Sequence, residues 1–596
     1  MLDNRGPATH GKLEVVVTSG SEYQRDIYRT IHAADVDLPH NSTKRYAFTV
    51  KIQSFTHELI IRLRQDVDII FSKSINLRPH FTDKNLAVVA DNSVAPDILS
   101  VLPQHLYPAN VRPNYLPEAW YGYEGVKLLI MGANAVRQLS ERQFEALTRW
   151  IKQGGQLVMG GSLNYGSLGE KRIRDILPIK VRGHRQFFEL KSLEHFCSQK
   201  LTSIKPFLVL NVAIDDAKVL VKENDIPLII QKKLGFGRIV FLSFDMNTPP
   251  FSRWDGRQML WDKILSVQSG VDRQMVDVDN QRILDSMLTG LPLKFPDFRS
   301  GLIFIGVYLI ILRILLTKIR RPGRSRWKFG LCIIVMISIF TYIGYRGFYY
   351  PHLKQNFAYN SLCRLNVSGT EALAFARYYI GLYSLKNTEY GVNFGSWSFP
   401  VSHLKSEKSN QKIPNPYVLH TKESGQHIIG SINRWSHNFY MLNLNLDSPL
   451  AGYARQDNSF LTLTVESKLP HNLVDCLIFY KKRFIFIEDI SANKRQIVKL
   501  NLTKLKKNEI FNDQEVDKIM GRFDGNGSSF YLRKTQQNLT PDLLLEIHNK
   551  YKTKPDSIIL IGWIQADMIR PQFSQPVPLG NGLTMVNWEL QVETTS

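Results

Sequence analysis

Two apolar runs on either side of a short basic segment constrain this chain more than any other feature. The first, "GLIFIGVYLIILRILLTKI", covers residues 301–319, and the second, "FGLCIIVMISIFTYIGY", covers residues 329–345. A helix that crosses a bilayer needs about 20 residues, with a lower limit of about 17. The runs therefore predict either a pair of buried core helices or a hairpin of two membrane helices.

The segment between the runs favours the membrane hairpin. "KIRRPGRSRWK", residues 318–328, holds six Lys and Arg residues. Because positively charged loops stay in the cytoplasm, we expect both large flanking regions to lie outside it. Arg313 interrupts the first run, but it is close enough to the basic end for its guanidinium to reach the interface. The residues that we expect to set this topology are Arg313, Lys318, Arg320, Arg321, Arg324, Arg326 and Lys328.

The beginning of the chain does not fit this topology without a further assumption. "MLDNRGPATHGKLEVVVTSG" has no apolar stretch of the kind found in signal peptides. Either the natural start lies upstream and the sequence is truncated, or the topology is inverted. We favour the upstream start.

Composition excludes several functional classes. The net charge is +22, but only residues 318–328 concentrate it, and no zinc-finger spacing or RNP-like motif is present, so we expect no nucleic-acid partner. The four cysteines form no C-x-x-C pair, and the histidines form no H-x-x-x-H pattern. We therefore expect no metal and no cofactor, although a single Cys363–Cys476 disulfide stays open as an alternative.

Apolar periodicity divides the 596 residues into several domains. Residues 1–82 alternate with period two in "KLEVVVTS", "RYAFTVKIQSF" and "HELIIRLRQDVDIIFSK", which predicts a β-sandwich-like module. Residues 83–272 alternate strands with helices, which predicts a mostly parallel sheet covered on both faces. Residues 273–300 are expected to be a linker, 301–345 the transmembrane hairpin, and 346–596 a β-rich domain outside the cytoplasm, with the strand spacing of a β-sandwich.

Local signals place individual elements within these domains. Ser140 and Gln143 have the spacing of a capping box for a helix that ends at Gly154–Gly155. "SVAPDILSVLP" (93–103), "GTEALAFARYYIGLYS" (369–384) and "TPDLLLEIHNKY" (540–551) are expected to be helices. "CLIFYKKRFIFIEDI" predicts a hairpin that turns at Lys481–Lys482.

Three stretches of the α/β region resemble a known family. They are "AWYGYEGVKLLIMG", "LSERQFEALTRWIKQGGQLVMGGS" and "KLGFGRIVFLSFDMNTPPFSRWDGRQMLW". They resemble the class I glutamine amidotransferase-like domains of bacterial membrane-anchored proteins of unassigned function, in which a membrane segment and a β-rich outer domain follow. The resemblance implies a flavodoxin-like sheet and, for the whole chain, a multidomain α/β plus β fold. Ligands bind such sheets at the carboxyl ends of the strands, where this sequence has Gly132, Gly160, Gly161, Ser162, Asn164 and Asp245.

Ser162 stands where the amidotransferases carry their nucleophile. The family's G-x-C-x-G elbow is here Gly160-Gly161-Ser162-Leu163-Asn164, with serine for cysteine and asparagine for the last glycine. A serine needs an adjacent base, and "FDMNTPP", after the last strand, contains no histidine; His184 and His195 lie in the insert. Three interpretations remain: a glycine turn that allows close packing, a ligand site without chemistry, and a catalytic serine. We expect the first or the second.

The sequence thus favours a non-catalytic protein anchored in the bacterial cytoplasmic membrane by two helices. Its outer domains are expected to bind a protein, a glycan or a small ligand of the cell envelope. Its partners would be the lipid bilayer and other envelope or membrane proteins. Two alternatives stay open: a membrane-tethered serine hydrolase or amidase that uses Ser162, and an accessory subunit of a transport or secretion complex that binds through the hairpin.

Overall fold

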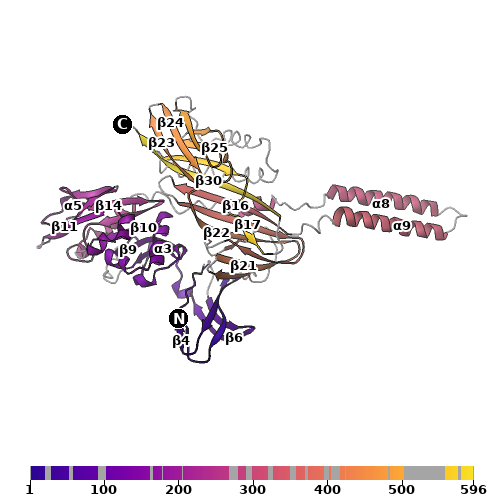
Figure 1. The fold of residues 1–596 in the computed structure, drawn as a ribbon, viewed down its shortest axis with the longest axis horizontal. Coiled ribbons are helices and arrows are strands. Elements are labelled where there is room, and N and C mark those ends of the chain that lie inside the picture. Colours follow the sequence, from indigo (N-terminus) through magenta and orange to yellow (C-terminus); the bar gives the residue numbers. More distant parts are fainter. Residues whose placement is uncertain are drawn as a thin grey trace.

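The protein consists of a central body of β-sheets with an α/β unit on one side and two long helices extending from the other (Figure 1). The computed structural model describes residues 2–19, 28–50, 52, 58–82, 84–90, 102–161, 165–177, 179–203, 206–215, 217–266, 280–289, 298–319, 326–349, 357–368, 373–394, 402–404, 417–422, 425–457, 459–480, 483–502, 557–574 and 579–594. The helix expected at 540–551 lies outside these residues, as does nearly all of the one expected at 93–103.

The α/β unit contains a seven-stranded sheet. Side by side, its strands are β13 (Lys218–Glu223), β14 (Ile226–Leu234), β15 (Gly237–Leu242), β10 (Gln156–Gly160), β9 (Val126–Gly132), β7 (Asn85–Val89) and β8 (Leu106–Asn110). The last five run parallel, whereas β14 pairs antiparallel with both of its neighbours, β15 and β13. Numbered in chain order, the parallel strands lie 2-1-3-4-5, which is a common doubly wound arrangement. The expected mostly parallel sheet is therefore confirmed.

Helices cover both faces of this sheet. On one face are α2 (Ala133–Arg137), α3 (Glu141–Lys152) and α4 (Lys171–Ile176); on the other are α5 (Lys191–Cys197) and α6 (Arg257–Ser266). Successive side chains of β10 face these two helix layers in turn. Leu157 and Met159 belong to the core beneath α3, whereas Val158 belongs to the core beneath α5 and α6. Both sets of alternate residues are apolar, as a strand buried on two faces requires.

Helix α3 begins and ends where the sequence predicts. The Ser140 hydroxyl accepts a hydrogen bond from the Gln143 backbone N–H at 3.2 Å, and the Gln143 side chain accepts one from the Ser140 N–H at 3.0 Å. This confirms the capping box. After the helix, Gly154 has a φ of +110°, which favours glycine. A Cβ on Gly155 would lie 2.4 Å from the buried Trp150 ring, so the second glycine allows the chain to pass close to that ring.

The insert before β13 and several short segments complete this unit. The insert holds β11 (Ile179–Phe187) and β12 (Phe207–Ile214), which pair antiparallel. The 3₁₀ segments of this half of the chain are Arg78–His80, Pro113–Tyr115, Trp120–Tyr123, Tyr165–Gly169 and Phe251–Arg253, labelled η1 to η5 in order.

An eight-stranded sheet joins the beginning of the chain to its C-terminal half. Its order is β29 (Gln572–Phe573), β18 (Thr388–Asn393), β21 (Gly425–Ile432), β20 (Tyr417–Lys422), β3 (Tyr28–Leu38), β2 (Thr9–Ser19), β5 (Glu58–Gln65) and β6 (Asp68–Asn76). The parallel pairing of β20 with β3 makes the connection. The expected strands β2, β5 and β6, together with β3, which was not predicted, are thus half of a larger sheet.

The segment 45–50 differs from the sequence prediction for the N-terminal region. The strand expected from "RYAFTVKIQSF" does not form over 45–50, the part that the structure describes. Tyr46 and Phe48 instead pack against the core of Leu13, Val36, Leu38 and Leu63. These two alternate residues cover one face of the sheet. Just before them in the chain, the short strand β4 (Ser42–Lys44) pairs with β1 (Leu2–Asn4).

The C-terminal half is built on an eleven-stranded sheet. Its main path is β19 (Ser402–Leu404), β22 (Ser436–Asp447), β17 (Leu373–Ser384), β16 (Phe357–Ser368), β30 (Leu579–Thr594), β23 (Leu450–Asp457), β24 (Phe460–Ser467) and β27 (Arg495–Asn501). Branching from it are β28 (Ser557–Ile564), β25 (Val474–Tyr480) and β26 (Arg483–Phe486). Tyr480 pairs with Arg483, so the hairpin expected at Lys481–Lys482 is confirmed in its two strands.

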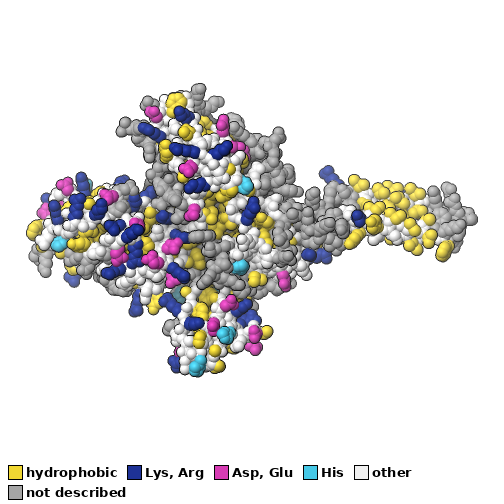
Figure 2. Space-filling view, viewed as in Figure 1, with side chains coloured by type: hydrophobic (Ala, Val, Ile, Leu, Met, Phe, Trp, Pro, Cys, Tyr) yellow, Lys and Arg dark blue, Asp and Glu magenta, His cyan; other side chains and the backbone are white. Residues whose placement is uncertain are grey.

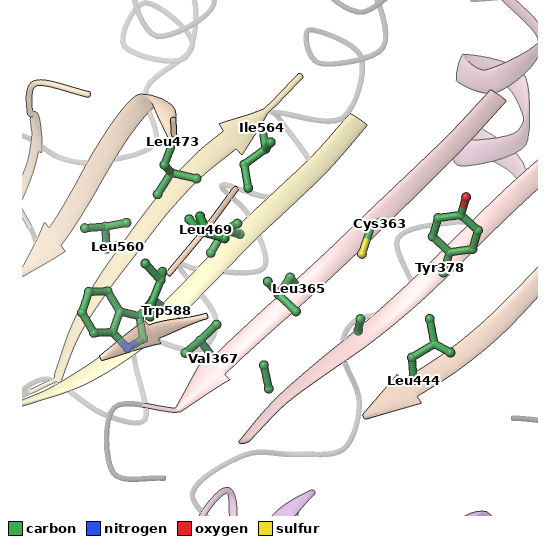
Figure 3. Packing of buried hydrophobic residues seen from close by; sticks show 14 of the residues in the cluster. Cys363, Leu365, Val367, Tyr378, Leu444, Leu469, Leu473, Leu560, Ile564 and Trp588 are labelled. Atoms are coloured by element: carbon green, nitrogen blue, oxygen red, sulfur yellow. The ribbon is translucent and has the colours of Figure 1, made fainter. Parts of the chain in front are cut away.

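This sheet encloses the largest core of the described residues. Cys363, Leu365 and Val367 of β16 point into it beside Trp588 of β30 and Leu560 of β28 (Figure 3). Cys363 and Cys476 are both free thiols here, so the alternative of a disulfide between them is wrong.

Strand β17 replaces the helix expected at 369–384. It pairs with β16 on one side and with β22 on the other along its whole length. Tyr378 and Ile380 enter the main core, while Tyr379 and Tyr383 enter the core on the opposite face. The prediction was wrong because two long neighbouring strands override the local preference of an Ala- and Leu-rich stretch.

Helix α7 (Asn280–Thr289) lies within the expected linker. Ile283, Leu284 and Met287 are buried against β16 and β17, at the spacing of one helix face. The Asn360 side chain donates a hydrogen bond to the Met287 carbonyl oxygen at 2.8 Å. The chain is therefore attached to the β-sheet body a few residues before the apolar helices begin.

The two apolar runs form α8 (Phe298–Ile319) and α9 (Arg326–Gly344), which lie side by side (Figure 1). The Phe340 ring contacts Phe304 at 5.3 Å and Tyr308 at 5.2 Å between centroids. A π-helical turn, η6 (Tyr345–Tyr349), follows α9. Among the described residues, Gly330–Gly347 is long and apolar enough to cross a membrane, with a mean hydropathy of 1.5; the apolar part of α8, Gly301–Thr317, is shorter.

Candidate functional site

The carboxyl ends of the central parallel strands form the candidate site. Gly132 at the end of β9 is the register partner of Gly160 at the end of β10, and Gly160 is the partner of Leu242 at the end of β15. Asp245 follows three residues after Leu242. The structure therefore brings the strand-end glycines together, as the sequence predicts. Ser162 and Asn164 lie outside the described residues.

Gly161 has a packing role. Its N–H donates a hydrogen bond to the Leu242 carbonyl oxygen at 2.7 Å. A Cβ at this position would lie 2.8 Å from that oxygen, 2.9 Å from Leu210 Cδ1 and 3.1 Å from the Ser243 carbonyl carbon. Atoms of Leu242, Leu210 and Ser243 thus occupy the space that a side chain at position 161 would need.

Gly160 differs from its neighbour. A Cβ on Gly160 would have no atom of the described residues within 4 Å. Close packing among these residues therefore explains Gly161 but not Gly160.

Asp245 forms the turn that leaves β15. Its carboxylate accepts a hydrogen bond from the Asn247 N–H at 2.9 Å, and its carbonyl oxygen accepts one from the Thr248 hydroxyl at 3.2 Å. A carboxylate bonded to the backbone two residues ahead is an Asx turn. These bonds give the half-buried side chain a structural role without a ligand.

The two histidines of the insert lie in different environments. His184 on β11 is the register partner of Leu210, whose side chain lies against Gly161, and it is exposed. His195 is exposed on α5, a helix whose Leu193 and Cys197 pack on the other face of the sheet. His184 is therefore the insert histidine on the side of the glycine turn.

The described residues of the α/β unit and the β-sheet body offer little metal or thiol chemistry; the exposed cysteine, Cys332, lies on α9. Among them, no group of three or more His, Cys, Asp or Glu side chains could hold a metal ion. Burial raises the pKa of Cys197 and of Cys476 to about 12 and raises that of Cys363 as well. A buried thiol that stays protonated is a poor nucleophile.

A half-buried carboxylate, Asp567, was missed by the sequence analysis. Asp567 accepts a hydrogen bond from the Tyr359 hydroxyl at 2.8 Å and another from the Ser361 hydroxyl. Desolvation raises its pKa, and hydrogen bonds from these hydroxyls partly oppose that shift. A Cβ on Gly582 would lie 2.2 Å from the carboxylate, so this glycine makes room for it. The one local signal is the alternating "GNG" of Gly580 and Gly582 within a strand.

Contacts between described residues join the α/β unit to the β-sheet body at the end of α3 and before β9. The Gln153 side chain, just after α3, donates a hydrogen bond to the Asn445 side chain on β22. The Trp120 ring meets Phe375 of β17 edge to face, with 6.4 Å between centroids. The candidate site is thus held against the body through the end of α3 and the segment before β9.

The basic residues flank the turn between α8 and α9. Arg313 is exposed on α8, Lys318 lies in the last turn of α8, and Arg326 and Lys328 lie in the first turn of α9. Arg320, Arg321 and Arg324 are outside the described residues. The positions that are described lie toward the end of the helix pair farthest from the β-sheet body (Figure 1).

Family models match the two ends of the chain. Domain of unknown function (DUF8726) matches residues 1–78, and Domain of unknown function (DUF8725) matches residues 450–593. The first region contains β1 to β6 and the second contains β23 to β30. Neither region includes the α/β unit, and no curated protein matches the chain.

Similar solved structures were also found. Cytoplasmic Protein STM1381 from Salmonella typhimurium LT2 is 14% identical, with 35% of this chain and 94% of that chain covered and a TM-score of 0.24. Cytoplasmic Protein STM3548 from Salmonella typhimurium is 16% identical, with the same coverage and a TM-score of 0.25. An exo-beta-1,4-mannosidase, Op5Man5 from Opitutaceae bacterium strain TAV5, is 14% identical, with 30% and 36% covered and a TM-score of 0.21. TM-scores this low support no conclusion about fold or function.

Proposed function

We propose that this protein is a non-catalytic membrane-anchored protein of the bacterial cell envelope, whose outer domains bind a protein, a glycan or a small ligand. The observation that carries the proposal is the surface of α8 and α9. Exposed apolar side chains gather along both helices in the face that Figure 2 shows, and large exposed hydrophobic residues occur along both α8 and α9. Only 6% of the apolar segment Gly330–Gly347, which spans most of α9 and the start of η6, is buried. A core helix of a soluble protein would instead be covered.

The dimensions of the two helices suit a bilayer. With a rise of about 1.5 Å per residue, the 22 residues of α8 extend about 33 Å and the 19 residues of α9 about 28 Å. The hydrocarbon core of a bilayer is about 30 Å thick. A hairpin of two membrane-spanning helices therefore fits, and Arg313 is near enough to the end of α8 to reach the interface.

The basic residues supply the orientation. Because positively charged loops remain in the cytoplasm, the turn between α8 and α9 faces the cytoplasm and both large domains lie outside it. Helix α7 packs on β16 and β17 before the hairpin starts, so the anchor is joined to the β-sheet body that it displays.

The α/β unit supplies a ligand site in this proposal. Its strand order and the stretches quoted above support an amidotransferase-like domain, in which the carboxyl edge of the sheet takes the ligand. Gly161 and Asp245 already have structural roles, and serine stands where the family has cysteine. These features favour binding without turnover at this edge.

Membrane extraction and protease protection test the proposal. In cells that express the full chain, it is expected to stay in the membrane after alkaline carbonate, whereas a chain lacking 301–345 is released. In intact spheroplasts, added protease is expected to cut both large domains and to spare a tag placed in the turn between α8 and α9. Release of the full chain by carbonate, or cutting only in inverted vesicles, would contradict the anchor or its orientation.

A further inference from the structure

His32 occupies a central position in the eight-stranded sheet. It lies on β3, where its register partners are Val15 of β2 and Leu419 of β20. Its side chain is 3% exposed. The same register row continues from Leu419 to Ile428 and Val392, which belong to the main core of the C-terminal half. A titratable side chain therefore lies in line with that core.

The pairing of β3 with β20 at His32 also joins the two halves of this sheet, and we call this ladder the β3–β20 seam. β3 and β20 pair parallel over Thr30–Ala33 and Tyr417–His420. Among the described strands of this sheet, this short ladder is what joins β2, β3, β5 and β6 to β20, β21, β18 and β29. Any loss of pairing here separates the beginning of the chain from the C-terminal half within the sheet.

On the side of the sheet that His32 faces, the charged residue in its register row of described strands is Lys73 of β6, a cation three strands away. Successive residues of a strand point to opposite faces, so its neighbours on that side are Leu13, Val15 and Val17 of β2, Leu59, Ile61 and Leu63 of β5, Ile428 of β21 and Val392 of β18. No carboxylate among them is placed to pair with an imidazolium.

The charged and titratable groups of the adjoining elements lie elsewhere. Glu14 points to the opposite face, where Arg62 and Arg64 pair with it. Lys12 and Asp35 share that face, and His427 also faces away from His32. His420 of β20 is in register with Ala33, and Lys44 of β4 donates to the Asp37 carbonyl oxygen near the end of β3.

We propose that the β3–β20 seam is an acid-sensitive device, in which protonation of His32 releases the N-terminal strands from β20. A buried cation without a partner costs several kcal/mol in a real protein interior, so the chain accepts the proton by opening the seam into water. The strands β2, β3, β5 and β6 then detach from β20, while the rest of the C-terminal body keeps its own pairings.

The pH range follows from the direction of the shift. Burial lowers the pKa of His32 from 6.5 to about 4 in the closed seam. Because the open form binds the proton more readily, the closed form has its full stability above about pH 6.5 and loses it as the pH falls toward 4. Between pH 7 and pH 5 the closing equilibrium is expected to weaken about 20-fold.

Hydrogen exchange of the full chain in lipid nanodiscs tests the proposal. After correction for intrinsic rates, peptides covering 28–38 and 417–422 are expected to lose about 20-fold in protection between pH 7 and pH 5. A peptide covering 126–132 of β9 serves as an internal reference and is expected to change little. His32→Leu is expected to abolish the loss at the seam. His10→Leu removes an exposed histidine of the neighbouring strand and is expected to leave it intact.

Two results would overturn the proposal. The first is a wild-type seam whose protection follows that of 126–132 at every pH, which requires no variant. The second is a His32→Leu protein that opens in acid as the wild type does. If His32→Leu does not fold, His32→Val keeps the comparison, because valine suits a strand position and carries no proton.

Discussion

Replacing Gly161 by alanine tests whether the glycine turn serves packing. The added Cβ would lie 2.8 Å from the Leu242 carbonyl oxygen, 2.9 Å from Leu210 Cδ1 and 3.1 Å from the Ser243 carbonyl carbon. Two of these three atoms belong to the backbone and cannot rotate away. Gly160→Ala is the matched control, because its Cβ would meet no atom within 4 Å.

The expected free-energy changes differ in size and can differ in sign. Overpacking a filled site costs about 1–3 kcal/mol, and the backbone contacts place Gly161→Ala near about 3 kcal/mol. Gly160→Ala meets no obstacle and reduces the freedom of the unfolded chain, which stabilises by about 0.4–1 kcal/mol. Since each 1.4 kcal/mol is tenfold in an equilibrium, Gly161→Ala is expected to lower the local folding constant by about 150-fold.

Hydrogen exchange in increasing urea measures this change for the α/β unit alone. The peptide covering 156–161 reports on β10 in the full chain, so the other domains need not unfold together with it. Protection is expected to collapse at lower urea in Gly161→Ala and to persist to slightly higher urea than in the wild type in Gly160→Ala. Equal stability of the two variants would refute the packing explanation, and Gly161 would again be a candidate ligand-binding residue.

Three further perturbations have expected outcomes. Ser140→Ala removes the cap of α3 and is expected to cost about 1 kcal/mol in urea unfolding of the α/β unit; Gln143→Ala is expected to cost more, because its side chain also donates to the Leu116 carbonyl oxygen at 2.7 Å. A double-mutant cycle of Gln153→Ala and Asn445→Ala is expected to show a coupling of about 0.5–1.5 kcal/mol, and zero coupling would remove this contact from the domain interface. The pKa of Asp567 is raised in the fold, so the stability that the protonated carboxyl contributes is full below its ordinary pKa of 3.8 and is lost as the pH rises through the folded pKa. The melting temperature of the wild type is therefore expected to fall as the pH rises across that range, and this fall is expected to be absent in Asp567→Asn.

Local signals in the sequence were sufficient for several elements. The capping box of Ser140 and Gln143 lies within one turn of chain, and the structure contains it. The alternation of strands and helices from 85 to 266 likewise led to the mostly parallel sheet. These features depend on residues that are neighbours in the chain, so their physical causes are visible without a fold.

Elements that depend on distant partners were not predictable in this way. The stretch 373–384 is a strand because β16 and β22 pair with it on both sides. Helix α7 is ordered by a sheet face that begins dozens of residues later. The carboxylate of Asp567 meets hydroxyls of Tyr359 and Ser361 more than 200 residues earlier in the chain. No local pattern specifies which distant segment will supply a partner.

The candidate site shows the same division. The sequence by itself determined that glycines and an aspartate follow the ends of parallel strands, because periodicity places those ends. It also determined the two apolar helices, because their length and apolar composition are properties of two continuous runs of residues. Only the tertiary structure decided that Gly161 is closely packed while Gly160 is open, and that β20 joins β3 beside His32. The physical reason is that packing and strand pairing are relations between segments far apart in the chain, whereas turns, caps and hydropathy belong to the segments themselves.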